Sequence, residues 1–400
     1  MASNDTKTAE ATATIKEIAA LDVSDPTTHG SIIQKCQSVI NALQNPLMVF
    51  TGVLASGTKH PCIVALSNMG VFAKLTDADG PLTATQLAEE CGADRLLVVR
   101  LMRVVTGEGI VLETGPETYA ATAITKILAM PASAAGLRIN HRVSEILNDL
   151  PSYLKQTQYR QPASYTDGLF QYHFKTDLGS FEYRARNDEW TRDFNHFMTL
   201  PTKIAQDWTE QFDAKTLIFG DGVEINPDVP LFVDIAGGMG QDLRLLKKHL
   251  GSDVITKRGQ LVLEDQPQVI DNIAADLYDE EFEYVKHNFF TPQPVRGARV
   301  YHLKSVLHDW PDDRAIEILR HTASSLAPGY SRIWILDSIV PDTGVPKGLA
   351  WVDITMMALF ASHERTKEQW AQLLADAGLR IAKLHYTPAG SSLIEAELEA

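Results

Sequence analysis

Cysteine is scarce in this 400-residue sequence, which holds only Cys36, Cys62 and Cys91. Three cysteines cannot form a disulfide framework, and since no two of them form a C-x-x-C pair, they provide no metal-binding motif. This low usage is typical of a reducing compartment. The N-terminal residues Met1–Thr6 lack the basic and apolar regions of a secretory signal peptide, and Ala2 excludes a myristoylation signal. We therefore expect a cytoplasmic protein.

Positive charge and long hydrophobic runs are also in short supply. The 36 Lys and Arg residues against 51 Asp and Glu residues leave a net charge of −15, which repels phosphate backbones and anionic lipid surfaces. The stretch Cys36–Thr58 carries no charge, but Pro46 and several Gln and Asn residues interrupt it. It therefore predicts a buried helix or an interface, not a membrane span. Neither nucleic acid nor a membrane is expected as a partner.

The remaining composition is that of an ordinary globular protein. Hydrophobic residues make up 44% of the chain and charged residues 22%, which excludes disordered and fibrous classes. A chain of 400 residues allows two or three folding units. The patterns described below predict three parts: a helical and winged-helix domain (1–125), a helical connector with substrate-side helices (126–215), and an α/β domain (216–400).

The end of the first part has the outline of a winged helix. The segment from Gly80 opens with a threonine that can cap a helix, and Gly92 ends that helix. Asp94 can cap a second helix, in which apolar residues recur at helical spacing. Two short strands are predicted at Ile110–Glu113 and Thr118–Ala121, with a Gly-Pro turn between them.

A winged helix can read DNA or serve as a packing and dimerisation module. Between Gly80 and Ile124 there are three arginines and six acidic residues. A helix that enters a DNA groove needs net positive charge. The sequence therefore favours a dimerisation module over a DNA-binding one.

In the last part, apolar strand-like runs alternate with helical stretches. This alternation predicts a Rossmann-like, doubly wound α/β sheet. The expected strands are Leu231–Ala236, Gln260–Glu264, Arg299–Leu303 and Arg332–Asp337, and the expected helices begin at Gln241, Gln268, Asp312 and Lys367.

The segment Leu231–Gly240 is an apolar strand that leads into the glycine-rich turn Gly-Gly-Met-Gly and then into a helix. Glycines here let the backbone approach a ligand closely. Asp265 follows the next strand, 25 residues after Gly240, at the place where carboxylates hydrogen-bond ribose hydroxyls. The pair predicts a nucleoside ligand, although such a turn can also do no more than pack a helix on a strand.

Two features favour S-adenosylmethionine over a dinucleotide. The glycine pattern is G-G-x-G and not G-x-G-x-x-G, so a nicotinamide dehydrogenase is the least favoured alternative. Asp242 lies in the first turn of the following helix, where a carboxylate opposes a bound pyrophosphate. S-adenosylmethionine has no phosphate, and its cationic groups tolerate nearby carboxylates such as Asp234.

Several segments together resemble one known family. They are Val233–Gly240, Glu264–Ile270, Leu303–Pro311 and Glu364–Thr366, joined by Phe181–Tyr183 and Phe194–Met198. In this order they resemble the caffeic-acid-type class I O-methyltransferases, and especially the fungal branch that acts on secondary metabolites. The resemblance implies a winged-helix dimerisation domain, a homodimer and a reaction that needs no metal. The apolar helix around Val39–Val53 is the expected intertwined surface.

The resemblance also assigns the cofactor residues. Gly237 and Gly238 would hold the methionine part of S-adenosylmethionine, and Asp265 would bind its ribose. At the adenine, where the family carries Asp and Met, this chain has Asn288 and Phe289, which can still hydrogen-bond and stack. The matching positions are therefore Gly237, Gly238, Asp265, Asn288, Phe289 and Lys304.

Methyl transfer to a phenol requires that the hydroxyl lose its proton as it attacks. A phenol has a pKa of about 10 and an imidazole of about 6.5, so a positioned histidine can take the proton as the new bond forms. His308 follows a strand end where α/β sheets present ligand-facing residues, although Asp309 and Pro311 also mark an ordinary helix entry. By resemblance, His308 is the general base, and Glu364 and Asp337 hold it, with Asp337 standing where plant members carry Glu.

Side chains that can line an aromatic substrate pocket are Phe194, Asn195, Met198 and Met357. Methionine and phenylalanine at helical spacing are as often core residues. Other histidines, including His302, are interpreted as packing residues.

The leading hypothesis is an S-adenosylmethionine-dependent O-methyltransferase that methylates a phenolic hydroxyl of a secondary metabolite, such as an aromatic polyketide. One alternative is a family member that binds the cofactor but catalyses a pericyclic rearrangement or a decarboxylation. The intact His308, Asp309 and Glu364 speak against that alternative. Another is a winged-helix regulator with a sensor domain, which the acidic charge of residues 80–125 disfavours.

Overall fold

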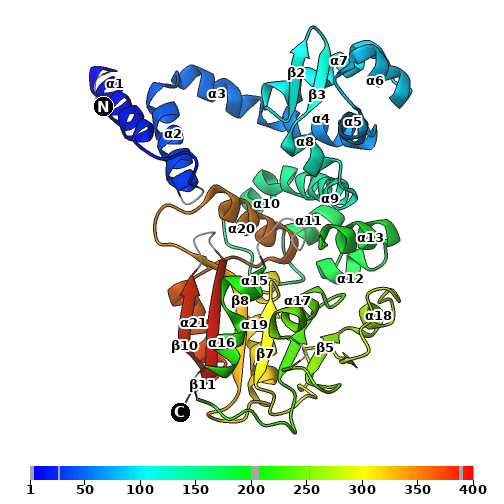
Figure 1. Cartoon of the computed structure of the whole chain (residues 1–400), viewed down its shortest axis with the longest axis vertical. Coiled ribbons are helices and arrows are strands. Elements are labelled where there is room, and N and C mark those ends of the chain that lie inside the picture. The colour runs from blue at the N-terminus through cyan, green and yellow to red at the C-terminus, as the bar shows by residue number, and fades with distance from the viewer. Residues whose placement is uncertain are drawn as a thin grey trace. The chain divides into compact units, whose positions relative to one another are not determined.

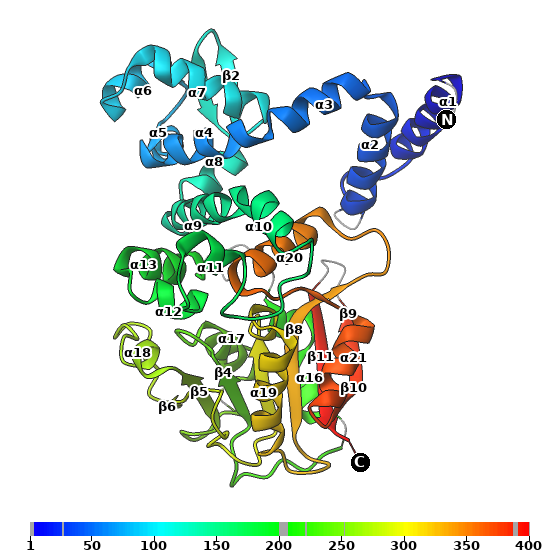
Figure 2. The same ribbon diagram turned by 180° about the vertical axis from the view of Figure 1, so that it is seen from behind.

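The computed structural model describes residues 4–25, 28–199, 207–220, 222–251, 253–386 and 391–399 (Figures 1 and 2). The chain divides into two compact units, Met1–Met130 and Pro131–Ala400. The helices of the predicted connector from residue 131 onward belong to the second unit.

The first unit is mainly helical and ends in a winged helix, as predicted. Thr83 and Gln86 form a capping box at α6, and Asp94 caps α7 through the amide of Leu97. The strands form a small antiparallel sheet in the order β1-β3-β2. The elements are α1 (Asn4–Ala19), α2 (His29–Leu43), α3 (Pro46–Leu54), α4 (Ser56–Asn68), α5 (Val71–Asp77), β1 (Leu82–Thr83), α6 (Ala84–Cys91), α7 (Arg95–Gly107), β2 (Val111–Gly115), β3 (Thr118–Ala121) and α8 (Ala123–Leu128).

The prediction of a single apolar helix around Val39–Val53 is wrong, because this segment forms two helices, α2 and α3. Asn45 caps α3 by accepting from the amide of Leu47, and Pro46 takes the first helical position, where its missing amide hydrogen is not needed. Neither α2 nor α3 has a buried residue. The large apolar side chains left exposed on them are Ile33, Ile40, Leu43, Leu47, Met48, Val49, Phe50, Val53 and Leu54.

No single helix in the described part of the chain is long and apolar enough to cross a membrane. The helices α3 and α4 reach that length and composition only when taken together, and they meet at a bend of 52°.

The second unit contains the predicted doubly wound sheet. Its strands lie in the order β10-β11-β8-β7-β4-β5-β6, and β9 pairs with β8 outside this path. β4 to β8 run parallel, whereas β11 is antiparallel to β8 and β10 is antiparallel to β11. The strands are β4 (Phe232–Ile235), β5 (Leu261–Asp265), β6 (Phe282–Lys286), β7 (Val300–Lys304), β8 (Arg332–Val340), β9 (Arg365–Thr366), β10 (Leu379–Tyr386) and β11 (Ser391–Leu398).

Side chains alternate between the two faces of this sheet, and each face has its own apolar core. On β4, Val233 and Ile235 join the core formed with α19 (Asp312–Ala323) and α21 (Lys367–Asp376). Phe232 joins the opposite core, formed with α15 (Trp208–Gln211), α16 (Ala214–Phe219) and α17 (Gln241–Leu250). Helices on both faces explain why the central strands are apolar on both sides. A single helical turn, α18 (Pro267–Ile270), follows β5.

A helical layer of the second unit has a third apolar core, rich in aromatic rings, which α20 shares with the helices that precede the sheet. Its members include Phe170, Trp190 and Phe360. The helices are α9 (Pro131–Asn148), α10 (Leu150–Gln156), α11 (Leu169–Phe174), α12 (Ser180–Arg184), α13 (Asp188–Phe197) and α20 (Lys347–Phe360).

Candidate active site

The order of the strands marks the place where a ligand should bind. From β4 the sheet continues to β5 and β6 on one side and to β7 and β8 on the other. In parallel sheets, ligands bind at the carboxyl ends of the strands where the order reverses in this way. The glycine-rich turn follows β4, and His308 follows β7, so both flank this point.

The turn after β4 is tightly packed against β4 and β5. A methyl group on Gly237 would stand 2.5 Å from Leu263 Cδ1 and would overlap Asp234 Oδ2. The residue before it, Ala236, has φ of +58°, a left-handed conformation that costs a non-glycine residue about 1–2 kcal/mol. Strain of this kind persists where surrounding structure over-determines it, and it clusters at ligand sites.

Asp265, the predicted ribose ligand, ends β5 with its carboxylate held by the backbone. Oδ2 accepts from the amide of Gly238 at 2.8 Å, and Oδ1 accepts from the amide of Gln266 at 2.7 Å. Burial raises the pKa of Asp265, and the two amides oppose that rise. The carboxylate is thus oriented toward the glycine turn.

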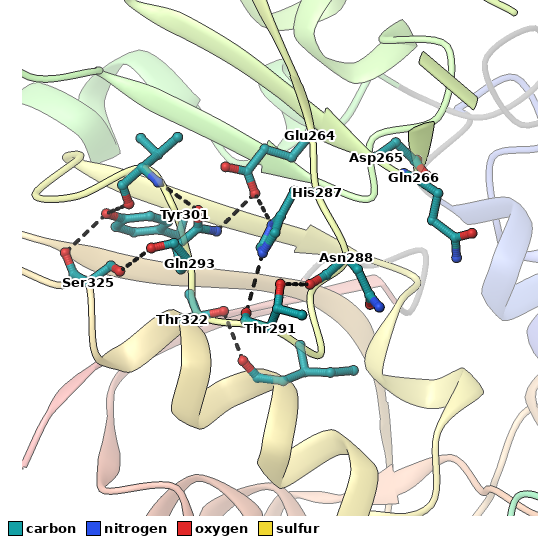
Figure 3. A network of polar contacts seen from close by, with 12 residues as sticks. Glu264, Asp265, Gln266, His287, Asn288, Thr291, Gln293, Tyr301, Thr322 and Ser325 are labelled. Carbon is teal, nitrogen blue, oxygen red and sulfur yellow. Dashed lines mark hydrogen bonds and ion pairs between the residues drawn. The ribbon is translucent and has the colours of Figure 1, made fainter. Parts of the chain in front are cut away.

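A buried polar network supports this part of the site (Figure 3). Glu264, next to Asp265 in the chain, accepts from Gln293 at 2.9 Å, and His287 Nδ1 lies 3.0 Å from the same Glu264 oxygen. The amide of His287 also donates to the carbonyl of Asp265 at 2.9 Å. The ends of β5 and β6 are therefore tied together, which fixes Asn288 relative to Asp265.

The two predicted adenine contacts, Asn288 and Phe289, have different partners within the protein. Asn288 accepts from the amide of Phe290 at 3.1 Å, which leaves its NH₂ group as the donor for a ligand. The ring of Phe289 packs edge-on against Trp310, with centroids 5.8 Å apart. Phe289 therefore belongs to the aromatic group beside the turn that carries His308.

Two pairs of polar side chains come from β4, β7 and α17, which flank the glycine turn. Asp234 Oδ1 lies 2.9 Å from His302 Nδ1, and both side chains are buried. Lys304 Nζ donates to Asp242 Oδ1 at 2.6 Å. The second oxygen of Asp234, Oδ2, is buried without a hydrogen-bond partner among the described residues.

These residues fit a nucleoside that carries positive charge. The turn is surrounded by three carboxylates, of Asp234, Asp242 and Asp265, against two cations: Lys304, which pairs with Asp242, and Arg244, whose Nη1 donates to the carbonyl of Met239 at 2.7 Å. Such a balance opposes a pyrophosphate and favours a cationic group. The unpartnered Asp234 oxygen faces the position that a Gly237 side chain would fill. Clusters of three or more candidate metal ligands are absent from the described residues.

His308 lies in a single 3₁₀ turn, Leu307–Asp309, immediately after β7. Its Nδ1 lies 2.8 Å from Glu364 Oε1 and 4.0 Å from Asp337 Oδ1. Glu364 therefore makes the hydrogen bond to the ring, while the shorter Asp337 acts on it through charge alone. On the other side of the ring, Nε2 is 3.7 Å from Asp309 Oδ1, which is too far for a hydrogen bond.

This arrangement gives the two ring nitrogens of His308 different tasks. A carboxylate at Nδ1 favours a proton there, which leaves Nε2 as the nitrogen that can accept one. Burial of His308 favours the neutral ring, but the charges of Asp337 and Asp309 and the hydrogen bond of Glu364 outweigh it and raise its pKa to about 10. Burial also raises the pKa of Asp337, to about 7.

The turn that carries His308 is clamped by Arg365. This buried guanidinium donates to the carbonyls of Leu307 at 3.0 Å and Trp310 at 2.9 Å, and to Asp312 at 3.0 Å. Because Arg365 follows Glu364 directly, one short segment fixes both the position of the turn and the orientation of the ring. The sequence analysis identified the segment Glu364–Thr366, but it did not predict that Arg365 would hold the His308 turn.

The four predicted substrate residues lie on or next to α13 and on α20. Phe194 on α13 is half-buried, and its ring centroid lies 4.6 Å from Arg184 Cζ. Asn195 and Met198 are exposed on or next to α13, and Met357 is half-buried on α20. Within the described residues, no hydrogen bond or ring contact joins these last three to His308, and their predicted role stays untested.

Two residues near the site escaped the sequence-based prediction. His302, interpreted as a packing residue, stands opposite Asp234 in the parallel register of β4 and β7, and strand order is not visible in a sequence. Arg184, at the end of α12, is buried with its guanidinium between aromatic rings. An arginine among the aromatic residues of Phe181–Met198 was the available signal.

Comparison with known families accounts for most of the chain. Residues 163–380 match the O-methyltransferase domain, and residues 54–131 match the O-methyltransferase dimerisation domain. The first match contains every predicted site residue, and the second contains the winged helix.

Individual relatives point the same way. O-methyltransferase asqD of Emericella nidulans is 36% identical over 82% of this chain and 84% of its own. Demethylsterigmatocystin 6-O-methyltransferase of Aspergillus flavus is 32% identical over 82% of each. Two solved structures have a similar fold at 29% identity, each covering 98% of this chain and 100% of its own: LepI in complex with SAM, with a TM-score of 0.87, and a pericyclic reaction enzyme, with a TM-score of 0.85.

Proposed function

Because the chain belongs to the O-methyltransferase family, we propose that it methylates a phenolic hydroxyl of a secondary metabolite, with S-adenosylmethionine as the methyl donor and His308 as the general base. The observation that carries the proposal is the hydrogen bond between His308 Nδ1 and Glu364. It leaves Nε2, the nitrogen that can take a proton, without a hydrogen-bond partner among the described residues.

The cofactor supplies an electrophilic methyl group on a sulfonium when it is bound. Asp265 would bind the ribose, and Asn288 and Phe289 would contact the adenine. The glycine turn Gly237–Gly238 and the free oxygen of Asp234 would hold the cationic methionine end. A relative solved with SAM, at 29% identity over 98% of this chain, supports the same cofactor here.

His308 does the acid–base work in this proposal. Its Nε2 removes the phenolic proton as the oxygen attacks, and Glu364 keeps the Nδ1 proton in place. The imidazolium that results is stabilised by Asp337 and Glu364, at 4.0 Å and 2.8 Å. Positioned general bases contribute about 10²- to 10⁴-fold to a rate.

A phenolic polyketide as the acceptor is supported by two observations. The aromatic rings of Phe181, Trp310 and Phe360 stack in one series beside the His308 turn, with centroids 5.5 and 5.0 Å apart, and sites for flat ligands are built mostly from apolar and aromatic side chains. The relative from Aspergillus flavus is named for the 6-O-methylation of demethylsterigmatocystin.

The direct test is transfer of a labelled methyl group from S-adenosylmethionine to a panel of phenolic polyketides by the full chain. Label in an O-methylated product is the expected result. Tight cofactor binding without label in any product, across hydroxylated xanthones, anthraquinones and naphthols, would contradict the proposal.

The second candidate is a non-methylating reaction, because a pericyclic reaction enzyme has a similar structure at a TM-score of 0.85. The two candidates differ in what happens to the cofactor. A methyltransferase converts it to S-adenosylhomocysteine in step with product, whereas a pericyclic enzyme turns over its substrate with the cofactor unchanged. Mass spectrometry of the cofactor after turnover separates them.

The carboxylates around His308 predict a distinctive pH dependence. Since only the neutral ring can accept a proton, kcat/KM should rise with pH, and the pKa of about 10 delays that rise. Replacing Asp337 by Asn removes a negative charge, lowers the pKa of His308 and should move the rise to lower pH by about one unit or more. The measurement is the pH profile of kcat/KM, which reports groups of the free enzyme. The exposed Asp313→Asn variant is the control, and an unmoved profile for Asp337→Asn would contradict the assignment.

We also propose that the chain forms a homodimer through the apolar surface of α2 and α3. The match of residues 54–131 to a dimerisation domain supports a homodimer. The nine exposed apolar side chains on α2 and α3, which precede that match apart from Leu54, support this surface, because patches of this kind mark interfaces. The double variant Phe50→Asp/Val53→Asp should shift a dimer to a monomer in light scattering coupled to gel filtration. The variant Tyr159→Asp, at an exposed aromatic residue outside the surface, should not. A monomeric wild type would contradict the proposal.

A further inference from the structure

Arg184 is a buried cation that lacks the partners such a group normally has. It ends α12 and is 5% exposed. Its Nε donates to the carbonyl of Ser180 at 3.3 Å, whereas Nη2 is buried with no hydrogen-bond partner among the described residues. Among the described residues, no carboxylate forms an ion pair with Arg184 within 4.0 Å.

Three aromatic rings surround the guanidinium. Its Cζ lies 4.6 Å from the ring centroids of Phe181 and Phe194 and 5.5 Å from that of Phe360. These contacts come from α12, α13 and α20, and they hold the planar group in one orientation. Cation–π contacts recover only part of what a charge loses when it leaves water. A buried cation without an ion-pair partner is expected to cost stability, and groups of this kind cluster at functional sites.

Arg184 lies close to the turn that carries the base, because the ring of Phe181, 4.6 Å from its Cζ, stacks on Trp310, two residues after His308, with centroids 5.5 Å apart. Asp309, the residue after His308, is largely buried: burial raises its pKa, and the positive charges of His308 and Arg184 lower it. In turn, burial lowers the pKa of Arg184, and Asp309 is the strongest charge that opposes this. Asp309 Oδ1 lies 3.7 Å from His308 Nε2, and among the described residues Arg184 forms no ion pair with it within 4.0 Å.

We propose that Arg184 is a substrate-binding residue whose free Nη2 donates to a second oxygen of the acceptor, a carbonyl or ionised hydroxyl close to the hydroxyl that His308 deprotonates. This inference rests on the proposed methyltransferase function and narrows its substrate class. The acceptor is a phenol with a neighbouring carbonyl oxygen. Such a group satisfies the unpartnered donor.

The opposing interpretation is a purely structural role, in which Arg184 only closes the aromatic cage. The two interpretations predict different melting temperatures for the variant Arg184→Met. If the cation is kept for binding, Arg184→Met removes an unpaired buried charge and retains the apolar stem, so the melting temperature of the free protein should not fall. If the cation is structural, the same variant should melt at a lower temperature.

The test uses two probes that differ only in the carbonyl, 1-hydroxyxanthone and 1-hydroxyxanthene. Their equilibrium binding to the full chain is measured by tryptophan fluorescence with saturating S-adenosylhomocysteine. The wild type should bind the xanthone at least about tenfold more tightly. Arg184→Met should weaken xanthone binding by about 10- to 100-fold, the range of a hydrogen bond to a charged group, and change xanthene binding by less than about threefold. Arg184→Lys should lie between the two, and the exposed neighbour variant Arg186→Met should behave as wild type.

Equal binding of both probes by the wild type would overturn the inference. Equal losses for both probes in Arg184→Met, with a lower melting temperature, would overturn it in favour of the structural role. Methyl transfer is assayed separately with the same phenols. Labelled product without a binding preference for the xanthone would support the methyltransferase proposal and contradict the role of Arg184 in substrate binding. A binding preference for the xanthone without any labelled product would support the role of Arg184 and contradict the methyltransferase proposal.

Discussion

Replacing His308 by alanine is expected to lower the rate of methyl transfer by about 10²- to 10⁴-fold, the contribution of a positioned general base. The affinity for S-adenosylmethionine should stay within about twofold of wild type. The reason is the separation of tasks in the site: His308 lies after β7, whereas the predicted ribose and adenine ligands follow β5 and β6. The measurement is single-turnover transfer of labelled methyl together with calorimetric binding of the cofactor.

The matched control for this prediction is His321→Ala, a histidine in the last turn of α19. It should leave both the rate and the affinity unchanged. Glu364→Gln should fall between wild type and His308→Ala, because the ring remains but its orienting carboxylate is lost. Equal rates for wild type and His308→Ala would remove the histidine from catalysis while leaving the methyltransferase proposal in place.

The second large effect is expected from Gly237→Ala. The added methyl group would overlap Asp234 Oδ2 and stand 2.5 Å from Leu263 Cδ1, so the turn must move to accept it. Overpacking of this kind destabilises a protein by about 1–3 kcal/mol. A displaced turn also loses the amide of Gly238 that orients Asp265. We expect cofactor affinity to fall by about 100-fold or more, since a 1.4 kcal/mol loss is already tenfold.

This prediction is checked by calorimetric titration with S-adenosylhomocysteine and by thermal melting. Gly348→Ala is the control, because nothing lies within 4 Å of the position where its methyl group would go. It should bind the cofactor as wild type does. Wild-type affinity in Gly237→Ala would mean that the turn packs a helix on a strand and does not hold the ligand.

Much of the local structure could be predicted from the sequence, because local physics decides it. The capping residues Thr83 and Asp94 begin α6 and α7, and a side-chain oxygen that satisfies a free helix amide acts within three residues of chain. The four predicted strands of the α/β sheet are all present, since their apolar runs are long enough to identify a strand. The strands β6, β10 and β11 were missed, because polar residues interrupt their apolar pattern.

The apolar segment around Val39–Val53 shows the limit of pattern alone. Its composition is that of a buried helix, yet Asn45 and Pro46 end one helix and begin another. Those two residues were visible in the sequence as interruptions. Uncharged composition alone predicts one helix here, whereas the cap chemistry of Asn45 and Pro46 predicts two.

What the sequence by itself determined is therefore the identity of the chemical groups: the glycine turn, Asp265, His308 and Glu364 stand in recognisable local patterns. Only the tertiary structure decided how those groups meet. The pairing of Asp234 with His302 follows from the register of two strands 68 residues apart, and the cage around Arg184 joins α12, α13 and α20. Contacts of this range depend on strand order and helix packing, which the summed burial of many distant side chains selects and no short stretch of sequence encodes.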